Sequence, residues 1–418
     1  MSAPIPQEQF AAALAPTPAA SSLAVRLWPA MWILAALIAT QILARDLALT
    51  RWSGDGSIAD VAQWGRDFVN VYTSGSLTLN GGLDILYNVD AYRAFQLGLF
   101  ESGMKYHNYS YPPVSLLYTW LFALVPYPVA LLSWLGGTGA LFVLAARPYL
   151  REAGLPIWLA VLAPASLINI WAGHYGFLIG ALWLGAWHVL PRRPVLAGVL
   201  IGLMVVKPHL AILAPLVLAR RREWVAIAAA GVTAGGLIAL SVALFGADLW
   251  ITYLTETARL QAAMVDDTES FFIMMMPTVT PSMALLGMKV GAGMAVQALV
   301  GIAAVGLLLW KLPKDSGQAG FAAAAATFLV LPYAFSYDMT VVGLGALILF
   351  HKAVTQRRPG SFQLLLMLAA LAPMSILYMN SYGVPLTPLL IGMQLLVALK
   401  LWRGEGPDEQ QPLRPVLC

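Results

Sequence analysis

The chain has 418 residues, of which 60% are hydrophobic and only 11% charged, with a formal net charge of +4. Soluble proteins carry about 25% charged residues, so this composition is too apolar for a water-exposed surface. Long unbroken apolar runs indicate a helical protein that crosses a membrane several times, and they exclude a barrel, whose strands would alternate. Basic residues of such proteins gather in cytoplasmic loops, so the positive charge does not indicate nucleic-acid binding. The single cysteine, Cys418, excludes disulfides within the chain and cysteine catalysis.

The first third of the chain contains one span and one large polar segment. Residues 1–22 predict a disordered tail, and the apolar run after Arg26 is long enough to cross a membrane. Residues 49–111 are polar, aromatic and slightly acidic, which favours a first periplasmic loop. Two apolar stripes in it predict helices that lie on the bilayer: Ile58, Val61, Gly65, Phe68 and Tyr72, then Val89, Tyr92, Phe95 and Leu99.

The apolar runs from there to residue 402 predict helical hairpins that form one membrane domain. Basic clusters mark their cytoplasmic ends, and polar breaks mark their apices. The breaks fall at 169–174, 207–209, 331–338 and 378–383. Segment 195–219 is too short for two crossings, so it is a re-entrant pair or one helix broken at Pro208. There are about thirteen apolar runs. An odd number of crossings would place the two termini on opposite sides of the membrane, which conflicts with both termini being cytoplasmic. At least one run between 112 and 190 therefore does not cross. Residues 246–282 form a second, acidic periplasmic loop, and 403–418 a tail.

Asp67 is the first candidate for chemistry. It lies beside the apolar stripe of the first predicted loop helix, where a half-desolvated carboxylate can act as a general base. The alternative is a solvated residue or a surface ion pair, which is common on interfacial helices. Asp60, two turns earlier on the same face, is a competing base.

The apical breaks supply further polar candidates. Lys207 and His209 flank Pro208 and have the chemistry to bind a phosphate, although Lys207 is also placed to extend toward the membrane interface. Tyr337-Asp338 is either functional or a helix cap. His174 is either a ligand contact or a structural residue, and Tyr111, before Pro112-Pro113, either contacts substrate or anchors the next span.

Nucleotide-binding and metalloprotease motifs are missing from the sequence. It contains no Walker A loop, no HExxH, no Asp-x-Asp pair and no glycine-rich dinucleotide loop after a strand. Chemistry that uses a nucleotide therefore has no recognisable site here.

Several motifs, taken together in order and spacing, resemble glycosyltransferase family 87, and in particular the mycobacterial polyprenol-phosphate-mannose-dependent α-mannosyltransferases. The chain differs by Gly-His in place of the usual Gly-Gln at 173–174, and by Tyr337-Asp338 where some of these mannosyltransferases carry His. It also lacks an Asn-Gln-Ser run before Met283, so the resemblance leaves the sugar and the acceptor open. The motifs are Arg66-Asp67-Phe68, Gly81-Gly82-Leu83-Asp84-Ile85-Leu86-Tyr87, Tyr111-Pro112-Pro113, Gly173-His174, Lys207-Pro208-His209-Leu210, Pro332-Tyr333 and Tyr337-Asp338.

The resemblance implies an all-α, polytopic GT-C-type bundle, here of about 11–13 apolar helices, in a bacterial inner membrane. It implies transfer of a sugar, with mannose as the first candidate, from a polyprenyl-phosphate donor to a lipid or glycan hydroxyl at the periplasmic face. The expected general base is Asp67, in an inverting displacement without metal or cofactor. Lys207, His209 and Arg66 are expected to stabilise the leaving phosphate, with His174, Tyr111, Tyr337 and Asp338 as further substrate contacts.

Two other functions are compatible with parts of the pattern. A secondary transporter also uses broken helices, but the two halves of this chain show no similar pattern. A lipid-linked polymerase or ligase usually has its large loop late in the chain, whereas here it comes first.

Overall fold

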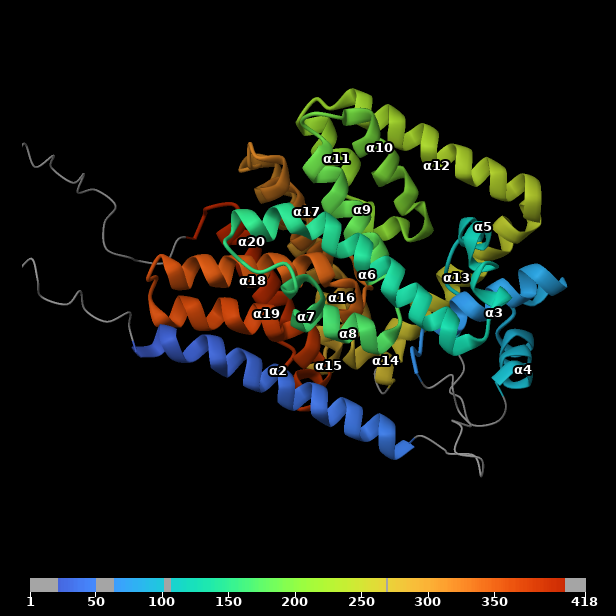
Figure 1. Cartoon of the computed structure of the whole chain (residues 1–418), viewed down its shortest axis with the longest axis horizontal. Helices are drawn as coiled ribbons and strands as arrows, with labels where there is room; N and C mark the ends of the chain where they lie inside the picture. Colours follow the sequence, from blue (N-terminus) through green and yellow to red (C-terminus); the bar gives the residue numbers. More distant parts are fainter. Residues whose placement is uncertain (1–21, 50–63, 101–106, 268–269, 403–418) are drawn as a thin grey trace, which may run out of the picture.

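The computed structural model describes residues 22–49, 64–100, 107–267 and 270–402, in which all regular structure is helical (Figure 1). The tails predicted at 1–22 and 403–418 lie almost wholly outside the described residues. Five helices are long and apolar enough to cross a membrane: α2 (Ser22–Leu49), α6 (Tyr127–Glu152), α12 (Trp224–Phe245), α16 (Val290–Trp310) and α19 (Gly360–Ser381). Six shorter apolar segments bring the total to the lower end of the expected range and confirm an all-α polytopic membrane protein: Gly176–Val189, Pro194–Val206, Pro208–Arg220, Ser316–Val330, Thr340–Thr355 and Thr387–Ala398.

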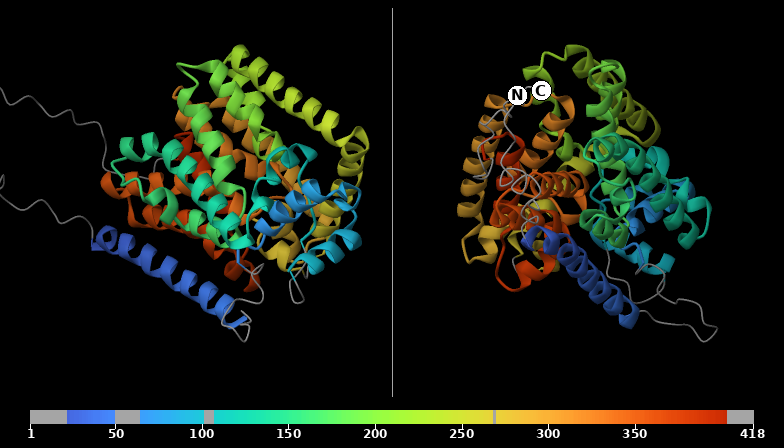
Figure 2. Two further views of the ribbon diagram at one scale, coloured as in Figure 1. Left: turned by 45° about the vertical axis from the view of Figure 1, so that its right-hand side comes forward. Right: turned by 60° about the vertical axis from the view of Figure 1, so that its left-hand side comes forward.

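The helices differ in how far they are enclosed. Only 11% of the apolar 18-residue stretch of α12 is buried inside the protein, whereas 61% of the corresponding stretch of α19 is buried. Figure 2 accordingly shows α12 and α2 along opposite outer edges of the bundle. A helix with so many exposed leucines and valines is stable only with lipid around it, because water would leave that apolar surface uncovered.

The segment around Pro208 is a re-entrant pair, one of the two predicted alternatives. Helix α10 (Pro194–Leu203) continues through η5 (Met204–Val206), turns at Lys207, and returns through η6 (Pro208–Ala211) and α11 (Ala214–Arg220). Each arm has about 13 residues, or roughly 20 Å at 1.5 Å per residue, which is short of a 30 Å hydrocarbon core. The turn therefore ends inside the protein, where it can line a cavity.

The re-entrant pair is held against α12 by close backbone approach. A side chain at Gly198 would collide with the backbone of Ala226 and one at Gly202 with Thr233, so both positions need glycine. Small residues at such crossings let helices approach closely when no hydrophobic effect drives them together.

The structure indicates which apolar run between 112 and 190 does not cross the membrane. The run after Pro113 divides into η3 (Pro113–Ser115), α5 (Leu116–Thr119) and η4 (Phe122–Leu124), each of three or four residues, so it does not cross. Helix α6 is then long and apolar enough for one full crossing. The chain returns through α7 (Leu159–Leu162) and α8 (Pro164–Ala172), and α9 (Gly176–Val189) follows.

The basic clusters gather at one end of the bundle, called the basic end below. Arg221 donates hydrogen bonds to the carbonyl oxygens of Pro313 and Lys314 at 3.0 and 3.1 Å, which joins two of the predicted clusters. The opposite end carries α3 (Phe68–Asn80), α4 (Val89–Phe100) and α13 (Ala247–Asp266), at the right of Figure 1. Grouping of Lys and Arg at one end is the arrangement expected of a membrane protein with a cytoplasmic basic face.

The first predicted loop differs in part from expectation. The helix expected from Ile58 begins only at Phe68 among described residues, and Ile58 and Val61 lie outside them. Helix α3 does not lie free on the bilayer, because nine of its thirteen residues are buried. Helix α4 covers the residues of the second predicted stripe, but its buried residues are Tyr92 and Gln96, and Leu99 of the stripe is exposed.

The segment predicted as a second loop is mostly helical. Helix α13 occupies twenty residues of it, and α14 (Phe271–Met274) and α15 (Val279–Leu285) follow. Asp248 and Asp266 of α13 are exposed, whereas Tyr253, Gln261 and Met264 face inward at helical spacing. After α16 come α17 (Ser316–Val330) and α18 (Thr340–Thr355), and α20 (Thr387–Ala398) follows α19 as the last helix of the described residues.

Candidate active site

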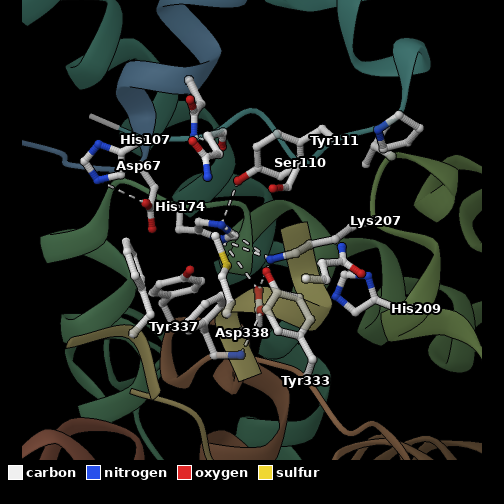
Figure 3. Close-up of a pocket in the computed structure, with 18 of the residues that line it drawn as sticks. Asp67, His107, Ser110, Tyr111, His174, Lys207, His209, Tyr333, Tyr337 and Asp338 are labelled. Atoms are coloured by element: carbon white, nitrogen blue, oxygen red, sulfur yellow. Dashed lines mark hydrogen bonds and ion pairs between the residues drawn. The ribbon is translucent and has the colours of Figure 1, made fainter. Parts of the chain in front are cut away.

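Three of the four predicted apical breaks meet at one cavity. It lies between α3, the chain after α8, the re-entrant turn and η7 (Ser336–Asp338), and α13 closes one side. The fourth break, at 378–383, lies elsewhere: Asn380 bonds the Met274 carbonyl at 2.9 Å, and Tyr382 is 82% exposed. Seven of the eight candidate residues line the cavity (Figure 3): Asp67, Tyr111, His174, Lys207, His209, Tyr337 and Asp338.

Asp67 stands at the start of α3 but does not cap it. Its side chain makes no cap hydrogen bond, while its backbone N–H donates to the Ala172 carbonyl at 2.9 Å and so fixes the loop to the end of α8. The carboxylate instead faces the cavity, where its Oδ1 lies 3.6 Å from Nε2 of His107. Burial raises the pKa of the Asp67 carboxyl above its usual value, although His107 and Lys207 oppose the shift. A carboxyl with these properties is a stronger proton acceptor than a solvated aspartate.

The glycines before and across from Asp67 make this approach possible. Gly65 has a φ of +76° and Gly173 a φ of +64°, in the left-handed region that favours glycine. A Cβ on Gly173 would collide with the backbone of Gly65. The Gly173-His174 turn thus carries the Asp67 loop on one side and presents His174 to the cavity on the other.

Lys207 and Asp338 form a buried ion pair at the centre of the cavity. Nζ of Lys207 lies 2.5 Å from Oδ1 of Asp338, and their side chains are 8% and 1% exposed. Oδ2 of Asp338 also accepts the N–H of Phe335 at 3.4 Å. Asp338 is therefore more than a helix cap, and Lys207 does not extend to a membrane interface, because a buried ammonium needs this carboxylate.

His174 joins this pair to Tyr111. Its Nε2 lies 2.8 Å from Oη of Tyr111, and its ring is stacked on that of Tyr337 at 4.0 Å between centroids. Burial, with the nearby Lys207 ammonium, lowers the pKa of His174 well below its usual range, so the ring is neutral. A neutral imidazole is an acceptor for Lys207, whose Nζ lies 3.4 Å from Nε2.

His209 provides a nitrogen that has no hydrogen-bond partner among the described residues. Its Nε2 is buried yet bonds to none of the described residues, and its ring lies 6.4 Å from that of Tyr333. In Figure 3, His209 and Asp67 lie on opposite sides of the cavity, with the Lys207–Asp338 pair between them. A buried polar atom without a partner at a cavity wall is suited to a ligand group.

Arg66 is the candidate that the structure places outside the cavity. Its Nη2 pairs with Oδ1 of Asp46 at 2.6 Å, and its guanidinium lies 4.2 Å from the centre of the Trp171 ring. Nε1 of Trp171 donates to the other oxygen of Asp46 at 2.7 Å. Arg66 therefore ties α2 to the Asp67 loop and α8. The competing base Asp60 lies outside the described residues.

Sequence reasoning missed several residues of the site. His107 lies beside Asp67, and Asn70 accepts a hydrogen bond from Tyr92 at 3.0 Å and donates one to the Asn108 carbonyl at 3.2 Å. The sequence signal for His107 was the polar stretch that directly precedes Tyr109. Tyr253 and its neighbours on α13 were hidden by the interpretation of that segment as a loop.

An apolar groove adjoins the polar cavity. Its walls come from α5, α6, α9, α10 and α12. Val206 lines both the groove and the cavity, next to Lys207, and Leu121 and Leu141 of the groove are about half exposed. The groove thus adjoins the cavity at Val206 and has exposed leucines on its outer side; its residues include Leu117, Leu141, Leu178, Leu203, Val206 and Leu237.

Comparison with known proteins identifies the family. No curated protein and no solved structure matches the chain. The family model for glycosyltransferase family 87 matches residues 109–336, which is more than half of the chain and includes Tyr111, His174, Lys207 and His209. Together with the all-α membrane fold, this match shows that the chain belongs to glycosyltransferase family 87.

Proposed function

We propose that this membrane glycosyltransferase takes its sugar from a polyprenyl-phosphate donor and uses Asp67 as general base. The observation that carries the proposal is the Asp67 carboxylate, which caps no helix and faces a cavity whose opposite wall holds His209 and Lys207. Base and phosphate-binding groups on opposite sides suit a displacement in which the nucleophile enters opposite the leaving group.

The reaction would proceed in one step. Asp67 takes the proton of the acceptor hydroxyl while the oxygen forms a bond to the anomeric carbon of the sugar. The bond from that carbon to the phosphate oxygen breaks, and polyprenyl phosphate leaves with the electron pair. Attack from the opposite side inverts the configuration, and donors already in place stabilise the charge that develops on the phosphate.

The phosphate-binding groups are Lys207 and His209. Asp338 neutralises Lys207 in the free protein, but the ammonium has three N–H donors and only one is needed for that pair. His209 contributes an Nε2 that has no partner among the described residues. As negative charge grows on the leaving phosphate, a fixed ammonium held by Asp338 needs no reorganisation to stabilise it.

The apolar groove supports a lipid-linked donor. A polyprenyl chain placed in the groove would bring its phosphate past Val206 to Lys207 without leaving an apolar environment. A nucleotide sugar would leave the groove empty and has no recognisable binding motif in the sequence. We assign the cavity to the periplasmic side because α3, α4 and α13 lie opposite the basic end.

The donor test uses purified full-length protein in lipid nanodiscs and a total lipid extract as acceptor. Labelled polyprenyl-phosphate mannose, glucose and arabinose are compared with a nucleotide sugar such as GDP-mannose. We expect transfer from a polyprenyl-phosphate sugar, with mannose as the first candidate, and none from the nucleotide sugar. Transfer from the nucleotide sugar alone would contradict the proposed donor.

A matched pair of variants assigns the activity to the site. Asp67→Asn should abolish transfer, while Asp90→Asn, which removes an exposed carboxylate from α4, should leave it unchanged. Uptake of substrate by vesicles without any transfer to an acceptor would favour a transporter over the proposed enzyme.

A further inference from the structure

A second cavity lies at the basic end, remote from the candidate active site. It opens where four helix ends meet: the C-terminal ends of α6, α18 and α20 and the N-terminal end of α17. Its volume is about 280 Å³ and it is open at the mouth, close to the lower limit of about 300 Å³ for small-ligand sites. It shares no lining residue with the active-site cavity, so it has no part in the reaction proposed above.

The wall of this cavity carries charges of both signs that do not pair with each other. Lys352 and Lys400 line it together with Glu152 and Asp315. Within the part of the chain that the structure describes, none of these four side chains forms a salt bridge. Asp315 caps α17 by accepting the Gln318 N–H at 2.8 Å on Oδ1, which leaves Oδ2 available. Opposite charges kept apart around one space suit a ligand that itself carries both signs.

The inner part of the cavity has an acceptor without a partner. Gln394 is 2% exposed and lines the cavity; its Nε2 donates to the Val342 carbonyl at 2.9 Å, and its Oε1 accepts no hydrogen bond from the described residues. A side chain at Gly345 would press on this amide and on Phe321, so glycine keeps the space for it. This amide oxygen is accessible from the cavity, so the N–H of a ligand can reach it.

The backbone at Lys400 is left-handed, as it also is at Arg222 and Arg357 after other helix ends. Lys400 has a φ of +59°, a left-handed conformation at a helix C-terminus where glycine is strongly favoured. A lysine at this position places an ammonium at the cavity mouth at the expense of backbone strain. The C-terminal ends of α18 and α20 attract cations, which is consistent with Lys352 and Lys400 standing there.

We propose that this cavity binds the headgroup of a zwitterionic phospholipid with a primary ammonium, its phosphate on Lys352 and Lys400 and its ammonium on Glu152, Asp315 and Gln394. The basic end is the level at which headgroups of the cytoplasmic leaflet lie. The carboxylates attract any cation, but the amide oxygen of Gln394 favours an N–H donor, which a primary ammonium has and a quaternary one lacks. Apolar lining residues receive the adjoining glycerol and acyl groups: Phe321, Ile348, Leu349 and Val397.

The test measures lipid binding to the full-length protein in detergent by native mass spectrometry. Phosphatidylethanolamine, phosphatidylcholine and phosphatidylglycerol are titrated in turn. Phosphatidylethanolamine should bind at least about tenfold more tightly than either of the others, because only it offers both the phosphate and the N–H donors. Equal binding of phosphatidylethanolamine and phosphatidylcholine would overturn the proposal, whatever the variants do.

Variants assign the binding to the cavity. Lys352→Ala/Lys400→Ala should weaken phosphatidylethanolamine binding about tenfold or more, and Glu152→Gln should reduce its preference over phosphatidylcholine. Arg192→Ala removes a charge from the same end outside the cavity and should change neither. Lipid binding by the double variant that equals wild type refutes the site. Soluble phosphoethanolamine should compete with the lipid; competition by inorganic phosphate to the same extent would refute the role of the ammonium.

Discussion

The buried ion pair of Lys207 and Asp338 allows stability and catalysis to be separated. The pair lies at 2.5 Å with both side chains at most 8% exposed, so neither charge can be solvated if its partner is lost. Removing one member of such a pair destabilises a protein by about 3–5 kcal/mol. We therefore expect Lys207→Met and Asp338→Asn each to lower the unfolding temperature markedly.

The double variant Lys207→Met/Asp338→Asn should recover much of that loss. It buries no isolated charge, so its destabilisation should fall short of the sum of the two single effects by about 2–3 kcal/mol. Its transferase activity should stay as low as that of Lys207→Met, because the ammonium that stabilises the leaving phosphate is absent. Thermal unfolding in detergent and sugar transfer are measured on all four proteins. Additive stability effects would refute the coupling, and an active double variant would refute the role of Lys207.

Three further predictions concern the loop that carries Asp67. Burial raises the pKa of Asp67, and only the carboxylate accepts a proton. The value of kcat/KM should therefore fall as pH decreases, with the midpoint of the decline above the usual aspartate range. A pH–rate profile with no acidic decline there contradicts this prediction. Arg66→Gln should cost about 1 kcal/mol of stability and less than tenfold in activity, since Arg66 pairs with Asp46 outside the cavity; a loss of donor affinity above 100-fold would return Arg66 to the phosphate site. Gly173→Ala should reduce kcat at least tenfold, because its Cβ meets the Gly65 backbone and displaces Asp67; wild-type kcat would show that this contact is not needed.

The composition and the polar breaks were enough to predict much of the site. Polar groups are costly among apolar helices, so Lys207, His174 and Asp338 stood out from their surroundings, and the structure brings them together. The break at Pro208 predicted an interrupted helix, because proline removes a helical hydrogen bond, and the re-entrant turn was one of its two interpretations. For these residues local chemistry and position in the chain were sufficient.

Other features depend on contacts that one sequence does not reveal. Arg66 is next to Asp67 in the chain, but Asp46 and Trp171 hold its side chain away from the cavity. His107 was missed because only the fold brings it beside Asp67, 40 positions earlier in the sequence. The acidic residues of the segment 246–282 do not reveal that α13 is helical; its helical spacing places Tyr253 and Gln261 on one inward face.

The most direct test of the central claim is the transfer rate of Asp67→Asn at saturating donor. A general base contributes about 10²- to 10⁴-fold, equivalent to about 3–5 kcal/mol of activation free energy. The side chain of Asp67 caps no helix, so the variant should keep the unfolding temperature and donor affinity of the wild type while its rate falls by that factor. A rate within about threefold of wild type in a folded Asp67→Asn protein would contradict the assignment of Asp67 as the base.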